Sequence, residues 1–249
     1  MDLVGKRVLL TGGGSGLGAV IARRMADAGM ALALSYASDR TRADATARAV
    51  QANGAEALVL HLDQSDPVSV ERGVAEAADA LGGLDILINN AGRAGGPPPG
   101  DLEAMTATEW DAQMLVNLRG PFLVSRAAAP VLRDAAPGRI INIGSVVGFG
   151  AAESQAAFTV SKASVIPLTR YLASCLAPDV LVNCVAPGLM QGTAMSGGAS
   201  DAYVAEWKSR ALLNRTTAIE DVASQVLTLC ATGSMTGQTV LVDGGLHFH

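Results

Sequence analysis

Short apolar runs alternate with longer runs of helical spacing along the whole chain. The continuous apolar character of the short runs predicts strands buried on both faces, as in a parallel sheet. These strands are predicted at Arg7–Thr11, Ala31–Ser35, Ala57–His61, Ile86–Asn89, Arg139–Ile143, Leu181–Val185 and Thr239–Val242. Helices are predicted between them at Leu17–Ala28, Thr41–Asn53, Pro67–Leu81, Thr106–Asp134, Phe158–Leu176 and Ile219–Ala231. The alternation predicts one α/β domain over residues 1–249, a doubly wound Rossmann-type fold with a seven-stranded, mostly parallel sheet.

Two segments interrupt this rhythm and are expected to be loops. Residues 93–100 are rich in Gly and Pro, and residues 189–213 contain Gly192, Gly197 and Gly198. Both leave the carboxyl end of a predicted strand, which is where open parallel sheets bind their ligands. We therefore expect both beside a binding site, with 189–213 as a lid over the substrate.

Composition and charge exclude several classes of function. Of the 249 residues 49% are hydrophobic and 16% charged, and the net charge is −5. No Lys/Arg cluster indicates a nucleic-acid partner, and no apolar run approaches the ~20 residues that a membrane span needs. The chain runs straight into its first strand without a leader, and Cys175, Cys184 and Cys230 are expected to be buried thiols, so we expect a cytoplasmic protein. His247 and His249 lack a third ligand, so no metal site is expected.

A glycine-rich turn follows the first predicted strand. It reads Gly12-Gly13-Gly14-Ser15-Gly16-Leu17-Gly18 and leads into a helix. Glycines let backbone N–H groups approach a pyrophosphate, and the helix N-terminus adds partial positive charge. A tight strand-to-helix turn without a ligand is the alternative. Its place in the first βαβ unit favours binding of a dinucleotide.

The turn and several later motifs together resemble the short-chain dehydrogenase/reductase family, and in particular its 3-oxoacyl-reductase-like members. The resemblance covers nearly the whole chain and implies redox chemistry between ketones and secondary alcohols with a nicotinamide dinucleotide. Its motifs are TGxxxGxG from Thr11 to Gly18, NNAG at Asn89–Gly92, the separate residues Asn117, Ser145 and Lys162, Pro187-Gly188, and Asp243-Gly244-Gly245.

The end of the second predicted strand bears on the choice of dinucleotide. No acid stands there to hold a ribose 2′-hydroxyl, whereas Arg40 and Arg42 follow closely, which favours NADP(H) over the alternative NAD. Asp39 weakens this positive charge, and both arginines would also suit a solvated helix face. With the resemblance included, the expected cofactor contacts are Gly12, Ser15, Gly16, Leu17, Gly18, Ser35, Arg40, Asp63, Asn90, Ala91, Gly92, Lys162, Pro187, Gly188, Met190 and Thr193.

The expected catalytic group is Asn117, Ser145, Phe158 and Lys162, and it departs from the family at one position. The family uses a Tyr phenol to pass a proton to the carbonyl oxygen, four residues before a Lys that lowers the phenol's pKa. Here Phe158 stands four residues before Lys162 and thirteen after Ser145, so no phenol is present. A general acid contributes roughly 10²–10⁴ in rate, so we expect ketone reduction to be impaired.

No other residue is an obvious replacement for the phenol. Tyr171 lies roughly 20 Å along the same helix, and surface roles are favoured for Tyr203 and Glu153. Pro121, four residues after Asn117, removes the N–H that would bond the Asn117 carbonyl. That carbonyl is free to hold a water in a proton relay like the family's, and an ordinary proline kink is the alternative.

Because Asn117, Ser145 and Lys162 are all present, three explanations of Phe158 stay open. The residue was introduced into an active enzyme, or it is natural and accompanies a changed chemistry, or the chain binds a dinucleotide without catalysis. A dehydration or isomerisation that uses Ser145 and Lys162 without a phenol is the second enzymatic hypothesis.

The expected substrate is a medium-sized, largely apolar ketone or secondary alcohol. The predicted helix at Phe158–Leu176 is apolar on more than one face and the C-terminal end is apolar, so a homotetramer or homodimer is expected, as in the family. The pocket walls are expected from Val147, Phe149, Ala151, Leu189, Met190 and Met195, with Arg93 at the rim.

Overall fold

A computed structural model describes residues 1–150, 154–193, 195–197 and 199–248. Seven strands form a single sheet in the order β3-β2-β1-β4-β5-β6-β7, and every neighbouring pair is parallel. The predicted seven-stranded sheet is therefore confirmed, and it is wholly rather than mostly parallel. The strands are β1 (Arg7–Leu10), β2 (Ala31–Tyr36), β3 (Ala57–His61), β4 (Ile86–Asn89), β5 (Gly138–Ile143), β6 (Val180–Pro187) and β7 (Thr239–Val242).

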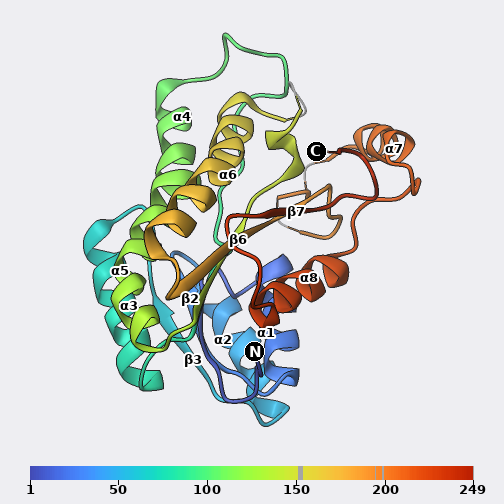
Figure 1. The fold of residues 1–249 in the computed structure, drawn as a ribbon. Coiled ribbons are helices and arrows are strands. Elements are labelled where there is room, and N and C mark those ends of the chain that lie inside the picture. Colours follow the sequence, from blue (N-terminus) through green and yellow to red (C-terminus); the bar gives the residue numbers. More distant parts are fainter. Residues whose placement is uncertain (151–153, 194, 198, 249) are drawn as a thin grey trace.

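Helices cover both faces of the sheet (Figure 1). They are α1 (Gly16–Asp27), α2 (Arg40–Ala52), α3 (Pro67–Leu81), α4 (Ala107–Met114), α5 (Gly120–Asp134), α6 (Ala156–Leu176), α7 (Asp201–Arg210) and α8 (Ile219–Ala231), with a π-helical turn at Leu115–Arg119 and a 3-10 turn at Val146–Gly148. No helix of the described residues has the length and apolar character that crossing a membrane requires.

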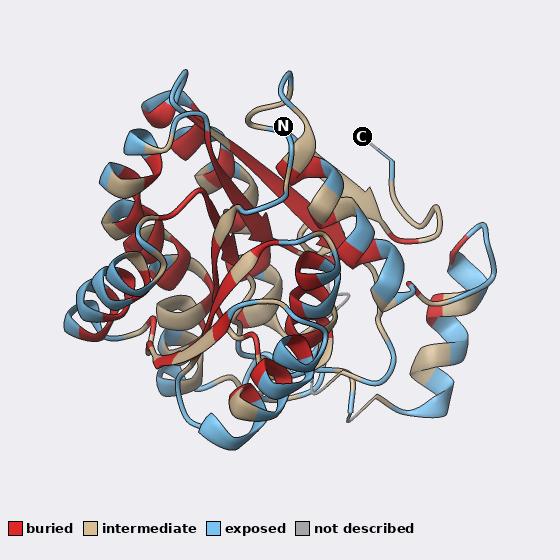
Figure 2. Cartoon of the chain, turned by 90° about the horizontal axis from the view of Figure 1, so that it is seen from below, coloured by how far each residue is buried: buried red, intermediate tan, exposed pale blue. Residues whose placement is uncertain are grey.

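The two faces of the sheet form two separate hydrophobic cores. Val8, Leu10 and Ile141 pack with α1, α2 and α8, whereas Leu9 and Ile140 pack with α3, α5 and α6. Successive strand residues alternate between the faces, so an apolar run fills both cores at once. Figure 2 shows the consequence, with the strands buried at the centre and the outer helix faces exposed.

The predicted helix Thr106–Asp134 is divided in two. Met114 ends α4, Pro121 stands at the start of α5, and a π-helical turn lies between them. Proline lacks the N–H that continues the regular hydrogen-bond ladder, and π-helical turns arise at such breaks. The break places Asn117 at the middle of the π-helical turn.

The segment 189–213, expected to be a loop throughout, contains the helix α7. The Ser200 side chain accepts the backbone N–H of Tyr203 and caps this helix, and Trp207 is its only residue classed as buried among those described. One buried position in ten residues gives no helical periodicity, which is why the pattern missed α7. In Figure 1 α7 stands apart from the two helical layers, close to the C-terminus.

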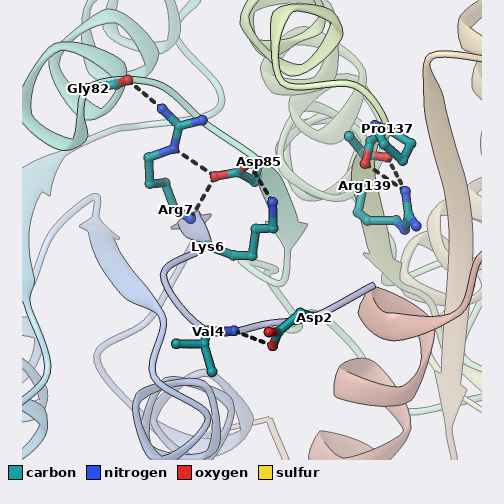
Figure 3. A network of polar contacts seen from close by, with 9 residues as sticks. Asp2, Val4, Lys6, Arg7, Gly82, Asp85, Pro137 and Arg139 are labelled. Atoms are coloured by element: carbon teal, nitrogen blue, oxygen red, sulfur yellow. Dashed lines mark hydrogen bonds and ion pairs between the residues drawn. The ribbon is translucent and has the colours of Figure 1, made fainter.

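A polar network closes the amino end of the sheet, opposite the glycine-rich turn (Figure 3). Asp85 accepts hydrogen bonds from Arg7 Nε at 2.7 Å and Lys6 Nζ at 3.4 Å, and Arg7 also donates to the Gly82 carbonyl. Arg139, which is fully buried, donates to the carbonyls of Pro137 and Gly138. The network links the start of β1 to the start of β4.

The three cysteines are free thiols, but they do not share one environment. Cys184 and Cys230 are buried as expected, whereas Cys175 is exposed. The expectation of three buried thiols is wrong for Cys175, because the residue lies near the end of α6 on its outer side.

Candidate active site

The glycine-rich turn has a geometry that only glycine permits at several positions. Gly12 and Gly16 have φ of +66° and +51°, in the left-handed region. A Cβ on Gly18 would clash with the Gly12 carbonyl and lie 2.7 Å from Asn90 Nδ2. The side chain of Ser15 makes no capping hydrogen bond to α1, so the first-turn N–H groups of α1 have no side-chain cap. Such a helix end suits a phosphate group.

Hydrogen bonds between Thr11, which follows β1, and Asn90, which follows the neighbouring strand β4, hold this turn in place. Thr11 Oγ1 accepts the N–H groups of Asn90 and Ala91, each at 3.0 Å. Asn90 Nδ2 donates to the Thr11 carbonyl at 2.9 Å and the Gly12 carbonyl at 3.0 Å. The amide of Asn90 is therefore engaged in fixing the turn.

The end of β2 and the start of α2 lie against the same turn. Ser35 is buried and its hydroxyl accepts the Gly12 N–H at 3.4 Å, so it faces the turn rather than the solvent. A Cβ on Gly14 would lie 2.8 Å from the Ala43 nitrogen, which shows how closely α2 approaches. Arg40 and Arg42, both exposed, stand at the positive end of α2 and pair with Asp44 and Asp39.

Asp63 and Gln64, which follow β3, extend the site on the other side of β2. The Asp63 carboxylate accepts hydrogen bonds from the Ser65 N–H at 2.9 Å and from its hydroxyl at 2.7 Å. Gln64 Nε2 donates to the carbonyls of Ala91 and Val116 at 3.1 and 2.6 Å, whereas its buried Oε1 has no hydrogen-bond partner. Sequence reasoning missed Gln64, since no motif distinguishes a Gln that ties two loops together.

Asn117 is held rigidly in the π-helical turn. Its Nδ2 donates to Ser161 Oγ at 3.0 Å and to the Arg93 carbonyl at 2.8 Å, and its Oδ1 accepts the Arg93 N–H at 2.8 Å. These bonds join the NNAG segment, the π-helical turn and α6. Asn117 is almost fully buried.

Lys162 is buried on α6, one turn after Phe158. Its Nζ donates to the Ile143 carbonyl at 2.9 Å, at the end of β5, and lies 6.0 Å from the centroid of the Phe158 ring. Burial lowers the pKa of Lys162 from its ordinary 10.5 to about 8, opposed in part by the neighbouring Cys184. An amine of this kind gains and loses its proton near neutral pH.

Ser145 lies two residues after β5 and caps the 3-10 turn that follows. Its hydroxyl accepts the N–H of Val147 at 3.4 Å. A Cβ on Gly148 would lie 2.7 Å from Ala163 Cα and 3.2 Å from the carbonyl carbon of Lys162, so this turn packs directly on α6. The contact brings the Ser145 segment beside Phe158 and Lys162.

Gly92 marks the point where the predicted catalytic group meets the segment 189–213. A Cβ on Gly92 would lie 3.5 Å from Lys162 Nζ, 3.4 Å from Asn117 Oδ1 and 2.9 Å from the terminal methyl of Met195. Thr193 lies 3.5 Å from the corresponding position on Gly16. The segment therefore crosses from the glycine-rich turn to Lys162.

Three of the expected pocket walls, Val147, Phe149 and Leu189, meet in one small cluster. Phe149, Phe158, Leu189 and Tyr203 pack against a core that includes Val147. Tyr203 is half-buried in this cluster, which differs from the surface role expected for it. Met190 packs instead against the core around α1. The expected contributions of Ala151 and Glu153 lie outside the described residues.

Different kinds of contact hold the rim and the floor of the site. Arg93 is exposed and donates to Glu109 at 2.8 Å. Pro187 ends β6, and the Gly188 N–H donates to the Val242 carbonyl at 3.0 Å. A Cβ on Gly188 would lie 2.6 Å from Thr217 Oγ1, so this position requires glycine for space.

The C-terminal segment folds back onto the same cluster. Asp243 accepts the N–H groups of Gly245 and His247, and its Oδ2 lies 3.3 Å from His247 Nδ1. The His247 ring lies 6.4 Å from the Phe149 ring, and Leu246 packs against the cluster. This Asp–His pair was not anticipated, because the motif Asp243-Gly244-Gly245 names the acid without its hydrogen-bond partners.

Comparison with known proteins agrees with this geometry. A family model described as Enoyl-(Acyl carrier protein) reductase matches residues 12–247. The 3-oxoacyl-(acyl-carrier-protein) reductase of Aquifex aeolicus is 34% identical over 250 residues, which cover 99% of each chain. A short-chain dehydrogenase from Burkholderia cenocepacia in complex with NADP is 36% identical with a TM-score of 0.89, covering 99% of each chain. A blue fluorescent protein from a metagenomic library, in complex with NADPH, is 32% identical with a TM-score of 0.90, covering 100% of each chain.

Proposed function

Because this chain belongs to the short-chain dehydrogenase/reductase family, we propose that it is an NADP(H)-dependent oxidoreductase built to interconvert ketones and secondary alcohols. The observation that carries the proposal is the convergence of Asn117 and Lys162 on Gly92, next to Ala91, which lies against Gly12 of the glycine-rich turn. When bound, the dinucleotide supplies or accepts the hydride. The chain's own side chains bind it, orient the carbonyl and hold protons.

The residues around the turn fit a phosphorylated dinucleotide. The close approach of α2 to Gly14 places Arg40, Arg42 and a helix N-terminus beside the turn. No acid stands at the end of β2 itself to hold a ribose 2′-hydroxyl, and the Asp39 carboxylate that follows pairs with Arg42. Asn90 and Ser35 fix the backbone of the turn. Lys162 would hold the nicotinamide ribose.

Calorimetric titration of the chain with NADPH and NADH tests the cofactor. We expect NADPH to bind at least about tenfold tighter than NADH, since Arg40 and Arg42 would make two charge-assisted contacts to its 2′-phosphate. Changing Arg40 and Arg42 together to Ala should weaken NADPH binding and leave NADH binding unchanged. Equal affinities in the unchanged chain, or tighter NADH binding, would overturn the assignment.

We propose that ketone chemistry is impaired in this chain because nothing at position 158 donates a proton. Ser145 keeps its place to orient a carbonyl, and Lys162 and Asn117 are held in one buried network. A Phe in place of the Tyr removes the group that the family uses to protonate the carbonyl oxygen. Hydride transfer to a ketone would then produce an unprotonated alkoxide at high energetic cost.

The substrate proposed is a medium-sized, largely apolar ketone or alcohol. Phe149, Leu189 and Val147 form an apolar wall beside Phe158, and the exposed Arg93–Glu109 pair lies at the rim. Residues 189–213 would act as the substrate lid, with Met195 reaching to Gly92 from this segment. A ketone screen with the Tyr-restored variant, described in the Discussion, tests the class.

A homotetramer or homodimer is proposed as the working form. Leu212, Leu213 and Phe248 are 70%, 59% and 79% exposed, which is unusual for such large apolar side chains. The edge strand β7 is half-buried along its length. Light scattering coupled to size exclusion tests this, and a monomer at micromolar concentration would refute it. The free thiols support the cytoplasm as the proposed location.

A further inference from the structure

Aromatic side chains are concentrated beside the predicted reaction centre. The chain has four Phe, two Trp and three Tyr, and four of these nine residues (Phe149, Phe158, Tyr203 and Trp207, here the aromatic cluster) belong to one packed group. Val146, the residue after Ser145, lies in the core of that group. Phe149, Phe158 and Tyr203 are only half-buried.

One ring of the aromatic cluster already accepts a positive charge. The Arg210 guanidinium carbon lies 5.8 Å from the Trp207 ring centroid. The negative face of an aromatic ring attracts cations, most strongly where water is excluded. The rings of the site therefore favour a cationic ligand as well as an apolar one.

The missing phenol restricts which substrates can accept a hydride here. A ketone needs a hydride at carbon and a proton at oxygen, and Phe158 supplies no proton. An iminium ion needs only the hydride, because its nitrogen already carries the positive charge that a carbonyl must gain by protonation. The chemistry that survives the loss of the phenol is thus the reduction of a cationic C=N bond.

We propose that this site reduces preformed iminium ions that carry an apolar body, with the aromatic cluster binding the cation. The inference rests on the proposed binding of NADPH. The hydride and its electron pair form the new C–H bond, the π pair of the C=N bond becomes the nitrogen lone pair, and the products are a neutral amine and NADP⁺. No proton enters or leaves the balance, so the step needs no acid at position 158.

Lys162 is the group that opposes a bound cation. Burial lowers its pKa to about 8, so above that pH most of the molecules carry a neutral amine there. Its titratable neighbour Cys184 stays neutral, because burial raises the pKa of that thiol to about 11. At the edge of the cluster the Asp243 carboxylate accepts the backbone N–H of His247, and Glu109 pairs with Arg93. Iminium reduction should therefore increase as pH rises through about 8.

The decisive experiment compares an iminium with a ketone of the same shape. At pH 9 with NADPH, we expect the chain to reduce N-methyl dihydroisoquinolinium at least about 10² faster than the enzyme-free blank, and α-tetralone hardly at all. Phe158→Tyr should raise the tetralone rate by roughly 10²–10⁴. An iminium rate no greater than the blank, in a chain shown by calorimetry to bind NADPH, overturns the inference and leaves the proposed function standing. Failure to bind NADPH defeats both.

A binding measurement tests the aromatic cluster without turnover. N,N-dimethyl tetrahydroisoquinolinium is a saturated cation that cannot accept a hydride, and gem-dimethyl tetralin is its neutral counterpart. With NADPH present at pH 9, the cation should bind about tenfold or more tighter than the neutral compound, and Phe149→Leu should reduce that preference. Tyr171→Leu, which removes an exposed ring elsewhere on α6, is the matched control and should change neither affinity. Equal binding of the two compounds to the unchanged chain contradicts the cation site.

Discussion

Phe158 packs against apolar side chains, but it also lies close to the buried amine of Lys162. The phenyl ring packs beside Val147 and Phe149, yet the amine of Lys162 lies 6.0 Å from its centroid. The same amine reaches the end of β5 through the Ile143 carbonyl. A phenol in this place would sit beside a group able to lower its pKa, so the surroundings of Phe158 still suit a Tyr.

Lys162 itself should give a measurable pH signature of its burial. Its pKa falls from 10.5 in the unfolded chain to about 8 in the folded chain. Between these values the unfolded chain binds one more proton, so stability rises with pH through this window, by at most about 1.4 kcal/mol per unit. Chemical denaturation at pH 8 to 10.5 should show this slope, and Lys162→Met should remove it. Identical slopes in both chains would show that the amine is not perturbed.

The motifs named residues that lie close together in the structure, but they did not predict every hydrogen bond that these residues make. Lys162 and Asn117 both lie beside Gly92. The side chains of Ser35 and Asn90, whose contact with the cofactor stays a prediction, bond to the glycine-rich turn. Residue spacing carries no information about which of two adjacent polar groups a buried hydroxyl will choose, so this could not be predicted.

At the scale of elements, the segment after β6 is the part with the least sequence signal. It folds as a stretch from Leu189 that crosses the glycine-rich turn, followed by the helix α7. Its contacts are made by single side chains such as Met195 and Trp207 rather than by a periodic face. Periodicity predicted the other elements to within a few residues because each buries a regular face in one of the two cores.

Met195 should hinder entry of the dinucleotide. Its methyl lies in the space beside Gly92, Asn117 and Lys162, where the nicotinamide ribose is expected. Met195→Ala should raise the association rate constant of NADPH by about threefold or more, because the open site becomes more populated. Stopped-flow fluorescence measures this. Leu212→Ala, an exposed change farther along the segment, should leave the rate constant unaltered, and a slower rate in Met195→Ala would contradict the account.

The amino ends of β1 and β4 are joined by the Asp85 ion pairs shown in Figure 3. Burial raises the pKa of Asp85, but the hydrogen bonds and charge of Arg7, with Lys6, outweigh it and lower the pKa below 3.8. Stability from this carboxylate is thus present above pH 4 and lost as pH falls below it. Asp85→Asn should cost about 1–3 kcal/mol at pH 7.

Acid titration of the same variant checks the sign of that effect. The loss of stability below pH 4 should be shallower in Asp85→Asn than in the unchanged chain, and Asp79→Asn, on the exposed side of α3, should behave like the unchanged chain. A variant that unfolds in acid as steeply as the parent would show that the ion pairs contribute nothing.

For the whole molecule, alternation of apolar runs and helices was sufficient to predict the architecture. Strands such as β4 and β5 are buried on both faces and must lie between two helical layers. The position of the site follows from the same topology, since the carboxyl ends of β1, β4, β5 and β6 meet at one edge. The chemistry does not follow from topology, because the same fold accommodates either a Phe or a Tyr at position 158, and only the Tyr carries a phenol oxygen.

Placing a phenol oxygen at position 158 is the most direct test of the missing proton donor. The account predicts that Phe158→Tyr raises kcat for reduction of an apolar ketone with NADPH by roughly 10²–10⁴, with a smaller change in KM, because the proton is delivered mainly in the transition state. A Phe158→Leu variant is the control and should gain nothing. If the Tyr variant gains no activity on a ketone shown by calorimetry to bind beside NADPH, position 158 is not where this chain loses its proton donor, and the central claim is wrong.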